Sequence, residues 1–360
     1  MTVRLRHEVV RCSFRDPFRI ARTLESSEAT GMASVLVELT SDAADGIVAL
    51  GEGFPDAYYG ETVETVAMVL PLLVEAIAPL EARLVGAGVT LDGARAALIE
   101  TSQRMDAALG HNGAAKCAVD TALHDLVGKR LHVPVHEVLG LSAAIPPTDF
   151  TIGIDAPAIV GQRAARAGHF PALKIKLGGP QDLATLEAVR AAYAGPIRVD
   201  ANTGWTLEQG RRLLPELVRL GVELIEQPFP AHRLDLLAAL QADSSLPIVA
   251  DESAVTEPDL DRLVGLVAGV NVKLAKCGGP GPAARMLARA RELGFRTFLG
   301  CMEETSIGIA ASAAVAALAD WVDLDGNLLL ADDPFEGLEL GPDCRWQLTN
   351  APGLGVRRRA

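Results

Sequence analysis

The sequence predicts an α/β protein built on a (β/α)7β barrel of the TIM type, with an N-terminal α+β capping domain. Three observations carry this prediction. From about residue 147, short apolar runs alternate with amphipathic stretches. The runs are apolar almost throughout, as is typical of parallel strands that are covered on both faces. Charged residues close successive runs at intervals of 24, 26, 25 and 22 residues, which leaves room for one strand, one helix and two loops (Lys176, Asp200, Glu226, Asp251 and Lys273).

Residues 1–130 form the predicted capping domain. Period-2 alternation in TVRLRHEVV, SVLVELTSD and IVALGEG indicates three strands. Between the first two lies the long polar stretch DPFRIARTLESSEATG, and loops of this length inside compact domains are usually functional. Apolar residues at i, i+3, i+4 spacing then indicate helices in ETVAMVLPLLVEAIAPLEARL and AAKCAVDTALHDLVGKR. Strands followed by helices favour a separate α+β unit.

Residues 131–340 carry the barrel pattern. We expect eight strands, in the order DFTIGI, ALKIKL, PIRVD, VELIE, LPIVA, GVNVKL, RTFLG and WVDLD. Amphipathic stretches such as LATLEAVRAAY, LEQGRRLLPELVRL, PDLDRLVGLVAG, PAARMLARARELG and SIGIAASAAVAAL alternate with them. Residues 341–360 return to loops with a short strand-like CRWQLT, and we expect this segment to pack back on the capping domain.

Composition narrows the class of protein. The 360 residues carry a net charge of −13 with a pI near 5.0, which disfavours nucleic acid and anionic membranes as partners. No apolar run approaches the roughly 18 residues of a membrane span, and the N-terminus lacks a signal-peptide h-region. The five cysteines are scattered without CxxC spacing. We therefore expect a cytoplasmic protein that acts on a small molecule, and we expect it to be a homo-oligomer.

The charged residues at the strand ends predict one active site. In a parallel barrel the carboxyl ends of all strands face one cavity, so Asp200, Glu226 and Asp251 should converge there. Three carboxylates suit a hard divalent cation, and we expect Mg²⁺. Lys176 and Lys273 end the second and sixth strands, on nearly opposite sides of the mouth. One lysine can remove a proton from a carbon beside a carboxylate while the other returns a proton to the opposite face, with the metal as Lewis acid on the enediolate.

Taken singly, these residues are weak signals, because KxK is common and a strand-end Asp often caps the next helix. The prediction depends on their joint occurrence in the order of the strands. Each catalytic lysine must be neutral when it acts as a base. We expect the cation, together with Lys174 and Lys276, to lower the pKa of the catalytic lysines.

Six segments together resemble the enolase superfamily, in its muconate-lactonizing subgroup: ALKIKLGG, VDANTGW, IEQPFP, ADES, VNVKLAKCGG and LGCMEETSIGIAAS. The resemblance covers nearly the whole chain. It implies a Mg²⁺-dependent enzyme with lysine bases, a pairing for which this superfamily is itself an established example. No histidine lies near the seventh strand end, where the mandelate-racemase-like branch has its base.

Within the subgroup, Asp323 and Asp325 in WVDLDGN resemble the DxD pair with which dipeptide epimerases receive the substrate's α-ammonium. Their spacing of two should direct both side chains to one face at the end of the eighth strand. The resemblance implies epimerisation of the C-terminal residue of a dipeptide, such as L-Ala-L-Glu to L-Ala-D-Glu, with Lys174, Thr151 and Met302 also contacting the substrate. An o-succinylbenzoate synthase, an N-acylamino acid racemase or a cycloisomerase needs no ammonium site and is the alternative. A non-catalytic, metabolite-binding barrel is a more remote one.

The side-chain preference stays open in the sequence. Arg22 resembles the position at which Ala-Glu epimerases carry an arginine for the side-chain carboxylate. Glu303, after the seventh strand, favours a cationic side chain instead. We expect the loops at 16–31 and 54–62 to act as lids over the barrel mouth and to contribute to this specificity.

Overall fold

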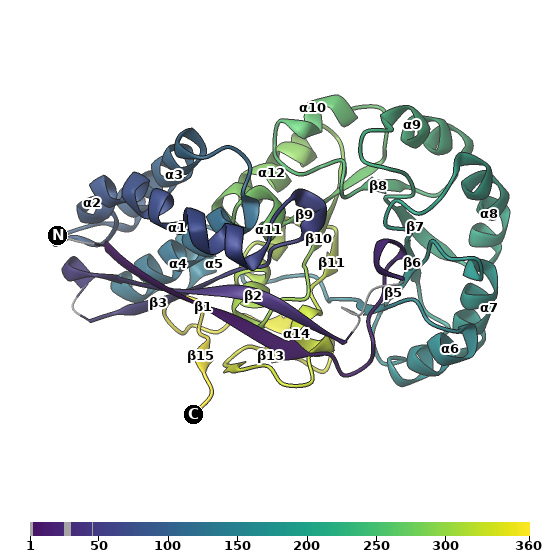
Figure 1. Cartoon of the computed structure of the whole chain (residues 1–360), viewed down its shortest axis with the longest axis horizontal. Helices are drawn as coiled ribbons and strands as arrows, with labels where there is room; N and C mark the ends of the chain where they lie inside the picture. Colours follow the sequence, from purple (N-terminus) through teal and green to yellow (C-terminus); the bar gives the residue numbers. More distant parts are fainter. Residues whose placement is uncertain (1–2, 25–29, 45) are drawn as a thin grey trace.

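The computed structural model describes residues 3–24, 30–44 and 46–360, and every structural statement below concerns these residues. Figure 1 shows an N-terminal sheet with its helices lying beside a barrel that carries helices on its outside. Both ends of the chain lie on the side of the N-terminal sheet.

The N-terminal sheet is an antiparallel meander of three strands: β1 (Val3–Ser13), β2 (Gly31–Ser41) and β3 (Val48–Gly53). β1 and β2 pair along their whole length, from Val3 opposite Ser41 to Ser13 opposite Gly31. The helices that follow are α1 (Val63–Ile77), α2 (Glu81–Val85), α3 (Leu91–Ala108) and α4 (Gly113–Leu131). The predicted order of strands and then helices is what the structure shows.

Helix α4 is buried over most of its length because it packs on β3 as well as on the helices around it. Two glycines make the close approach to β3 possible. A Cβ atom on Gly51 would lie 2.0 Å from the carbonyl oxygen of Ala118, and one on Gly53 would lie 2.3 Å from that of Ala114. Because side chains alternate along a strand, Glu52 between these glycines points to the opposite face, where it reaches the barrel.

One helical segment among the described residues, Val63–Val85, is long and apolar enough to cross a membrane by length and composition, with a mean hydropathy of 1.8. Thr62 caps its first turn by accepting a hydrogen bond from the backbone N–H of Thr65. The residues on its inner face, Val66, Leu70, Leu73 and Ile77, lie in the core of the N-terminal unit. This spacing is typical of an amphipathic helix on a sheet.

The barrel is an eight-stranded parallel sheet in which each strand lies beside the next one in the sequence. Its strands are β4 (Phe150–Ile152), β5 (Leu173–Lys176), β6 (Ile197–Asp200), β7 (Val222–Glu226), β8 (Ile248–Ala250), β9 (Gly269–Lys273), β10 (Arg296–Gly300) and β11 (Trp321–Asp323). All eight fall within the predicted runs. The predicted barrel is therefore confirmed.

Helices cover the outside of the barrel, most clearly along the arc from α6 to α10 in Figure 1. They are α6 (Pro157–Arg166), α7 (Asp182–Ala192), α8 (Leu207–Arg219), α9 (Leu234–Asp243), α10 (Asp259–Leu263), α11 (Leu274–Cys277), α12 (Pro280–Glu292) and α13 (Ser306–Ala313). The helix expected over PDLDRLVGLVAG is limited to the five residues of α10, since the chain turns at Gly265, where φ is +76°.

After β11 the chain forms only the four-residue helix α14 (Gly326–Leu329). β4 and β11 are the two ends of the strand order, and they meet through a hydrogen bond from the N–H of Asp149 to the carbonyl of Val322 (3.0 Å). Beyond α14, β12 (Phe335–Glu336) pairs with β15 (Arg357–Arg358), and β13 (Glu339–Leu340) pairs with β14 (Trp346–Gln347).

The C-terminal segment touches both units. The N–H of Leu354 donates to the carboxylate of Asp125 in α4 (2.8 Å), and the side chain of Arg358 pairs with Glu8 in β1. Trp346 donates from Nε1 to the carbonyl of Leu324 beside the barrel (2.7 Å). The segment therefore ties the N-terminal helices to the barrel.

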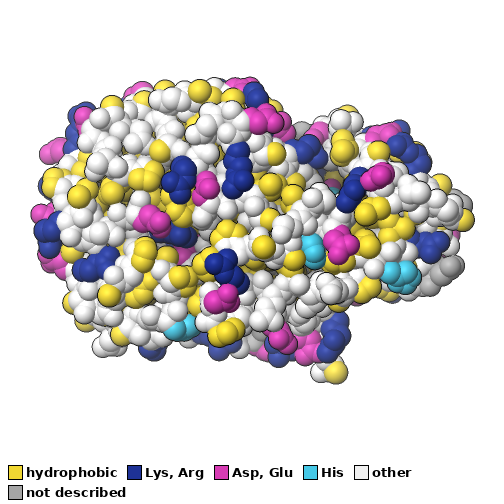
Figure 2. Space-filling view, turned by 180° about the vertical axis from the view of Figure 1, so that it is seen from behind, with side chains coloured by type: hydrophobic (Ala, Val, Ile, Leu, Met, Phe, Trp, Pro, Cys, Tyr) yellow, Lys and Arg dark blue, Asp and Glu magenta, His cyan; other side chains and the backbone are white. Residues whose placement is uncertain are grey.

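Figure 2 shows one face of the molecule, on which hydrophobic, acidic and basic side chains are interspersed. No single sign of charge covers that face.

Candidate active site

The five charged residues predicted for the site lie at the carboxyl ends of consecutive strands. Lys176, Asp200, Glu226 and Lys273 are the last residues of β5, β6, β7 and β9, and Asp251 directly follows β8. The strand register places Lys176 opposite Asp200 and Asp200 opposite Glu226. The parallel barrel thus brings all five to one mouth, as the spacing predicts.

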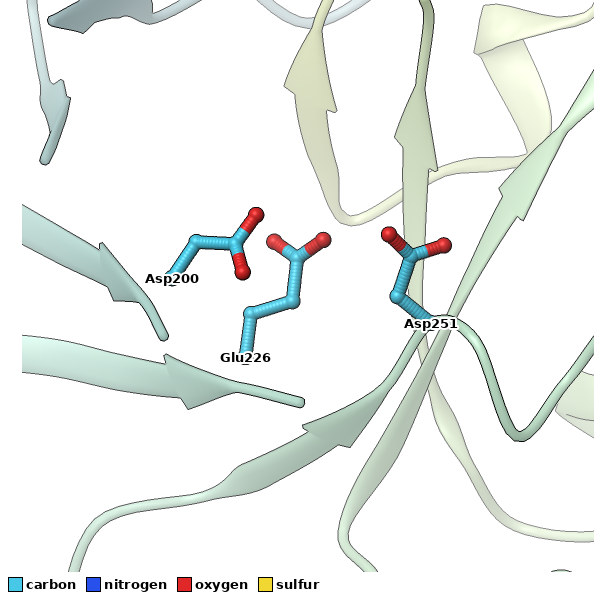
Figure 3. Close-up of side chains that lie close together, drawn as sticks. All are labelled: Asp200, Glu226 and Asp251. Carbon is cyan, nitrogen blue, oxygen red and sulfur yellow. The ribbon is translucent and has the colours of Figure 1, made fainter. Parts of the chain in front are cut away.

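Three carboxylates at this mouth form a candidate metal site. One oxygen each from Asp200, Glu226 and Asp251 lies within 4.8 Å of the others, and all three residues are buried. In Figure 3 the three side chains, from three neighbouring strand ends, point toward one another. Three buried hard oxygen donors around one space fit a Mg²⁺ ion, which usually takes carboxylates and retains coordination positions for water or substrate.

Lysines neutralise these carboxylates. The ammonium of Lys174 lies 2.8 Å from Glu226, 3.3 Å from Asp200 and 2.8 Å from Asp323. Burial opposes its charge, but Asp323 and Glu226 outweigh burial and raise the pKa of Lys174. Burial, and then Asp200, raise the pKa of Glu226 to about 8. A cation bound to this carboxylate would favour its ionised form.

The two candidate bases each have a carboxylate partner. The ammonium of Lys176 lies 2.7 Å from Asp200, and that of Lys273 lies 2.8 Å from Asp251. The pKa of Lys273 differs from the expectation of a lowered value. Burial and Lys174 do lower it, but the carboxylate of Asp251 outweighs both, so the pKa is raised. The sequence indicated the effect of Lys174 on this pKa but not the ion pair between Lys273 and Asp251.

Asp323 and Asp325 are held together by Thr151 of β4, across the junction between the first and last strands. Thr151 donates from its hydroxyl to Asp323 (2.9 Å) and from its backbone N–H to Asp325 (2.5 Å). The prediction that both acids end the strand is wrong in one respect: β11 stops at Asp323, and Asp325 is the N-cap of α14. The two carboxylates nevertheless meet on Thr151.

The pKa values of these two acids are shifted in opposite directions. Burial opposes ionisation of Asp323, but Lys174 outweighs it and lowers the pKa. Burial, and then the charge of Asp323, raise the pKa of Asp325. By itself Asp325 therefore favours its neutral form, and an ammonium bound beside the pair would favour its ionised form.

The loop after β1 reaches over the mouth. In Figure 1 it runs from the end of β1 to the region of β5 and β6. Ala21 touches two barrel loops there: a Cβ atom on Gly178 or Gly204 would lie 2.6 or 2.8 Å from the Ala21 Cβ. The N–H of Ile154 donates to the carbonyl of Arg19 (2.8 Å). The described part of the predicted lid is thus seated on the barrel, whereas residues 25–29 lie outside the described residues.

Arg22, in the short 3-10 turn Ala21–Thr23, binds protein carboxylates. Its guanidinium pairs with Glu252, lies 3.8 Å from Asp56 and stacks over Tyr58, 4.3 Å from the ring centroid. The sequence analysis named Arg22 but overlooked Glu252, which directly follows the metal-site residue Asp251. An acid in the loop after a barrel strand is a signal that could have identified it.

Met302 and Glu303 lie in the loop between β10 and α13. They line one small cavity with several of the other predicted residues: Thr151, Lys174, Lys176, Asp323 and Asp325, together with Phe18 from the lid. The structure therefore brings every predicted substrate residue except Arg22 to this cavity. Arg22 instead pairs with Glu252, which directly follows Asp251.

Two amide side chains that the sequence analysis overlooked orient the carboxylates. Asn271 donates from Nδ2 to Glu226 (2.8 Å). Gln227 accepts from the backbone N–H of Asp251 (2.8 Å). Asn271 precedes Lys273 by two residues in β9, so the period of the strand could have placed it on the same face. Such hydrogen bonds fix the position of metal-binding groups.

Comparisons with known proteins agree with this geometry. Residues 1–140 match the N-terminal domain of the mandelate racemase / muconate lactonizing enzyme family, and residues 158–359 match the enolase C-terminal domain-like family. The L-Ala-D/L-Glu epimerase of Bacteroides thetaiotaomicron is 38% identical over 319 residues, covering 87% of this chain and 79% of the relative. The L-Lys-D/L-Arg epimerase of Methylococcus capsulatus is 36% identical over 354 residues, covering 94% of both chains. The crystal structure of the dipeptide epimerase from Enterococcus faecalis V583, complexed with Mg and L-Leu-L-Tyr, is similar with a TM-score of 0.86 and 30% identity, covering 99% of both chains.

Proposed function

Because the chain belongs to the mandelate racemase / muconate lactonizing enzyme family of the enolase superfamily, we propose that it is a Mg²⁺-dependent dipeptide epimerase that inverts the α-carbon of the C-terminal residue. One observation carries the proposal: two lysines end strands on opposite sides of the barrel, at a mouth that also holds three clustered carboxylates. Lys176 ends β5 and Lys273 ends β9, four strands apart in a barrel of eight. A substrate carbon between them would have one lysine on each face.

In this proposal Asp200, Glu226 and Asp251 would hold Mg²⁺, which would supply Lewis-acid stabilisation of the negative charge that develops on the substrate carboxylate. A neutral Lys176 or Lys273 takes the α-proton, and the electron pair of the broken C–H bond passes into the enediolate. The opposite lysine, protonated, donates a proton to the other face. One proton leaves and one is added, so only the configuration changes.

The same carboxylates connect metal binding to proton transfer. Asp200 is the close partner of Lys176, and Asp251 is the close partner of Lys273. When these carboxylates coordinate a cation, they stabilise the charge of each lysine less. The pKa of Lys273, which Asp251 raises, then falls, and this is the direction that a base requires.

The choice of a dipeptide rests on Asp323 and Asp325. Thr151 gathers the two carboxylates in the cavity that Lys176 also lines. A substrate α-ammonium would complement the pair through charge-assisted hydrogen bonds. We assign Thr151 the role of positioning these acids, and we propose that Lys174 contacts the substrate carboxylate. The relatives named above, which are dipeptide epimerases, support this choice over an o-succinylbenzoate synthase, an N-acylamino acid racemase or a cycloisomerase.

Deuterium exchange tests the proposal directly. A panel of L,L-dipeptides is incubated with the protein and Mg²⁺ in D₂O, and mass spectrometry follows deuterium at the α-carbon of the C-terminal residue. We expect exchange with Mg²⁺ and none with excess chelator. Each dipeptide is also supplied in N-acetylated form, because acetylation removes the charge that Asp323 and Asp325 are proposed to bind. A preference for the acetylated compounds would replace the dipeptide assignment with an N-acylamino acid racemase.

The cytoplasmic location and the homo-oligomeric assembly expected from the sequence remain predictions. Size-exclusion chromatography with light scattering measures the assembly.

A further inference from the structure

The relatives act on dipeptides with acidic, hydrophobic or cationic side chains, so the family alone leaves the side-chain class of this enzyme open. We propose that the epimerised residue carries a cationic side chain, lysine or arginine, which is bound by Glu303. The inference rests on the proposed dipeptide epimerase function and names its substrate class. The inference depends on which charged residues around the mouth have an oppositely charged partner and which do not.

Arg22, the one residue that favours an acidic substrate, already has its charge neutralised. Its guanidinium is paired with Glu252, lies 3.8 Å from Asp56 and stacks on Tyr58. Burial opposes the charge of Arg22, but Glu252 outweighs it and raises the pKa. Binding a substrate carboxylate would draw Arg22 away from Glu252. That acid is 3% exposed and would then be left as a buried charge without its cation, which is costly.

Glu303 is in the opposite situation. It lines the cavity with Lys176, yet no ion pair to Glu303 occurs among the described residues, and the segments outside them contain no Lys, Arg or His. Lys176 itself lies 2.7 Å from Asp200. Burial raises the pKa of Glu303, and the charges of Lys176 and Lys273 oppose that shift without forming an ion pair with it. A half-buried carboxylate without a partner is stabilised by an incoming cation.

The total charge of the residues at the mouth also favours a substrate with a cationic side chain. Five basic residues contribute there: Arg22, Lys174, Lys176, Lys273 and Lys276. Eight acidic residues face them: Asp56, Asp200, Glu226, Asp251, Glu252, Glu303, Asp323 and Asp325. With all thirteen groups ionised, including Glu226 and Asp325, whose pKa values burial raises, the formal charge is −3, and a divalent cation changes it to −1. A dipeptide backbone is a zwitterion and adds nothing, so a cationic side chain makes the site neutral, whereas an acidic one makes it −2.

Two further acids make this count conservative. Glu304 directly follows Glu303 in the same loop, and Glu52 accepts hydrogen bonds from Thr305; both acids are buried, and burial raises the pKa of both. Any ionisation of these two would add negative charge behind the pocket. A buried site with excess negative charge discriminates most strongly against an anionic ligand.

The test compares three dipeptides that differ in charge at similar side-chain length: L-Ala-L-Lys, L-Ala-L-Met and L-Ala-L-Glu. On the wild-type holoenzyme with Mg²⁺, we expect the highest kcat/KM for L-Ala-L-Lys and the lowest for L-Ala-L-Glu. In Glu303→Gln, the ratio of kcat/KM for L-Ala-L-Lys to that for L-Ala-L-Met should fall about 10- to 100-fold, the effect of losing one charge-assisted hydrogen bond. Glu257→Gln, an exposed acid outside the mouth, is the matched control and should keep the wild-type ratio.

A second variant, Arg22→Gln, tests whether Arg22 binds the side chain of the substrate. Because Arg22 is held by Glu252, Arg22→Gln should lower turnover of all three dipeptides to a similar extent. A wild-type preference for L-Ala-L-Glu that is lost selectively in Arg22→Gln would overturn the inference, even if Glu303→Gln does not fold. In that outcome the dipeptide epimerase function stands and only the side-chain class fails. Absence of deuterium exchange with any dipeptide would instead reject the function itself.

Discussion

Replacement of Lys276 by methionine tests whether the protein positions its metal carboxylates before a metal binds. The ammonium of Lys276, 4% exposed, lies 2.5 Å from Oδ1 of Asp251 and 2.6 Å from its carbonyl oxygen. It also donates to the carbonyls of Asn271 (2.9 Å) and Ala254 (3.0 Å). Methionine keeps the apolar stem but removes the charge and all donors. Breaking a buried ion pair costs about 3–5 kcal/mol. Because Lys273 still lies 2.8 Å from Asp251, we expect the free energy of unfolding to fall by about 3 kcal/mol.

Two measurements read out this change. Urea denaturation of the wild type and Lys276→Met, each with chelator, gives the difference in the free energy of unfolding. Isothermal calorimetry gives the Mg²⁺ affinity, which should fall because Asp251 loses one of the contacts that orient it. Arg219→Gln is the control: Arg219, at the end of α8, pairs with Glu216 of the same helix and with Glu187 of α7, and such exposed pairs contribute little.

Two results would contradict this reasoning. An unchanged urea midpoint in Lys276→Met would show that Lys273 and the backbone suffice to compensate the buried Asp251. A lowered midpoint with unchanged Mg²⁺ affinity would limit Lys276 to stabilising the fold, with no part in positioning the carboxylate.

Three further predictions concern single groups. Asp200→Asn should lose most Mg²⁺ binding and nearly all turnover while the circular dichroism spectrum stays native, and full activity in chelator would reject the metal site. Lys176→Ala and Lys273→Ala should each abolish epimerisation but still exchange the α-proton of one substrate stereoisomer with D₂O. Exchange of both isomers by either variant would exclude two one-sided bases. Glu304→Gln should become more stable relative to the wild type as pH rises from 5 to 9. In the folded state burial, and then Glu52, raise the pKa of Glu304 from 4.5 to about 8. The wild type therefore loses stability as pH rises through this window, and the variant does not. Urea midpoints of the wild type and the variant that change in parallel with pH would refute this prediction.

The sequence predicted the elements whose signals are local. The eight barrel strands follow from apolar runs at regular intervals, and Lys176, Asp200, Glu226, Asp251 and Lys273 follow from where those runs end. Helix lengths were predicted less well, because α10 is cut short by a turn that the amphipathic pattern does not reveal.

Local sequence patterns could not predict the contacts between segments that are distant in the sequence. The pairing of Arg22 with Glu252 joins residues 230 positions apart, and the hydroxyl of Thr151 reaches Asp323 across 172 positions. Asp325 accepts a hydrogen bond from Thr151 although it lies beyond the strand, at the first residue before α14. None of these contacts can be deduced from the spacing of residues within one strand.

The sequence by itself determined the barrel, the order of the catalytic strand ends and the kinds of groups at the mouth, because strand period and loop length are properties of short segments. The tertiary structure decided which of those charges are neutralised. Arg22 and Glu303 carry opposite unit charges in the sequence. Folding gives Arg22 a buried acidic partner, whereas Glu303 lines the cavity without a basic partner among the described residues. That difference arises because the strength of an ion pair depends on the distance and burial of both partners, which only the folded chain fixes.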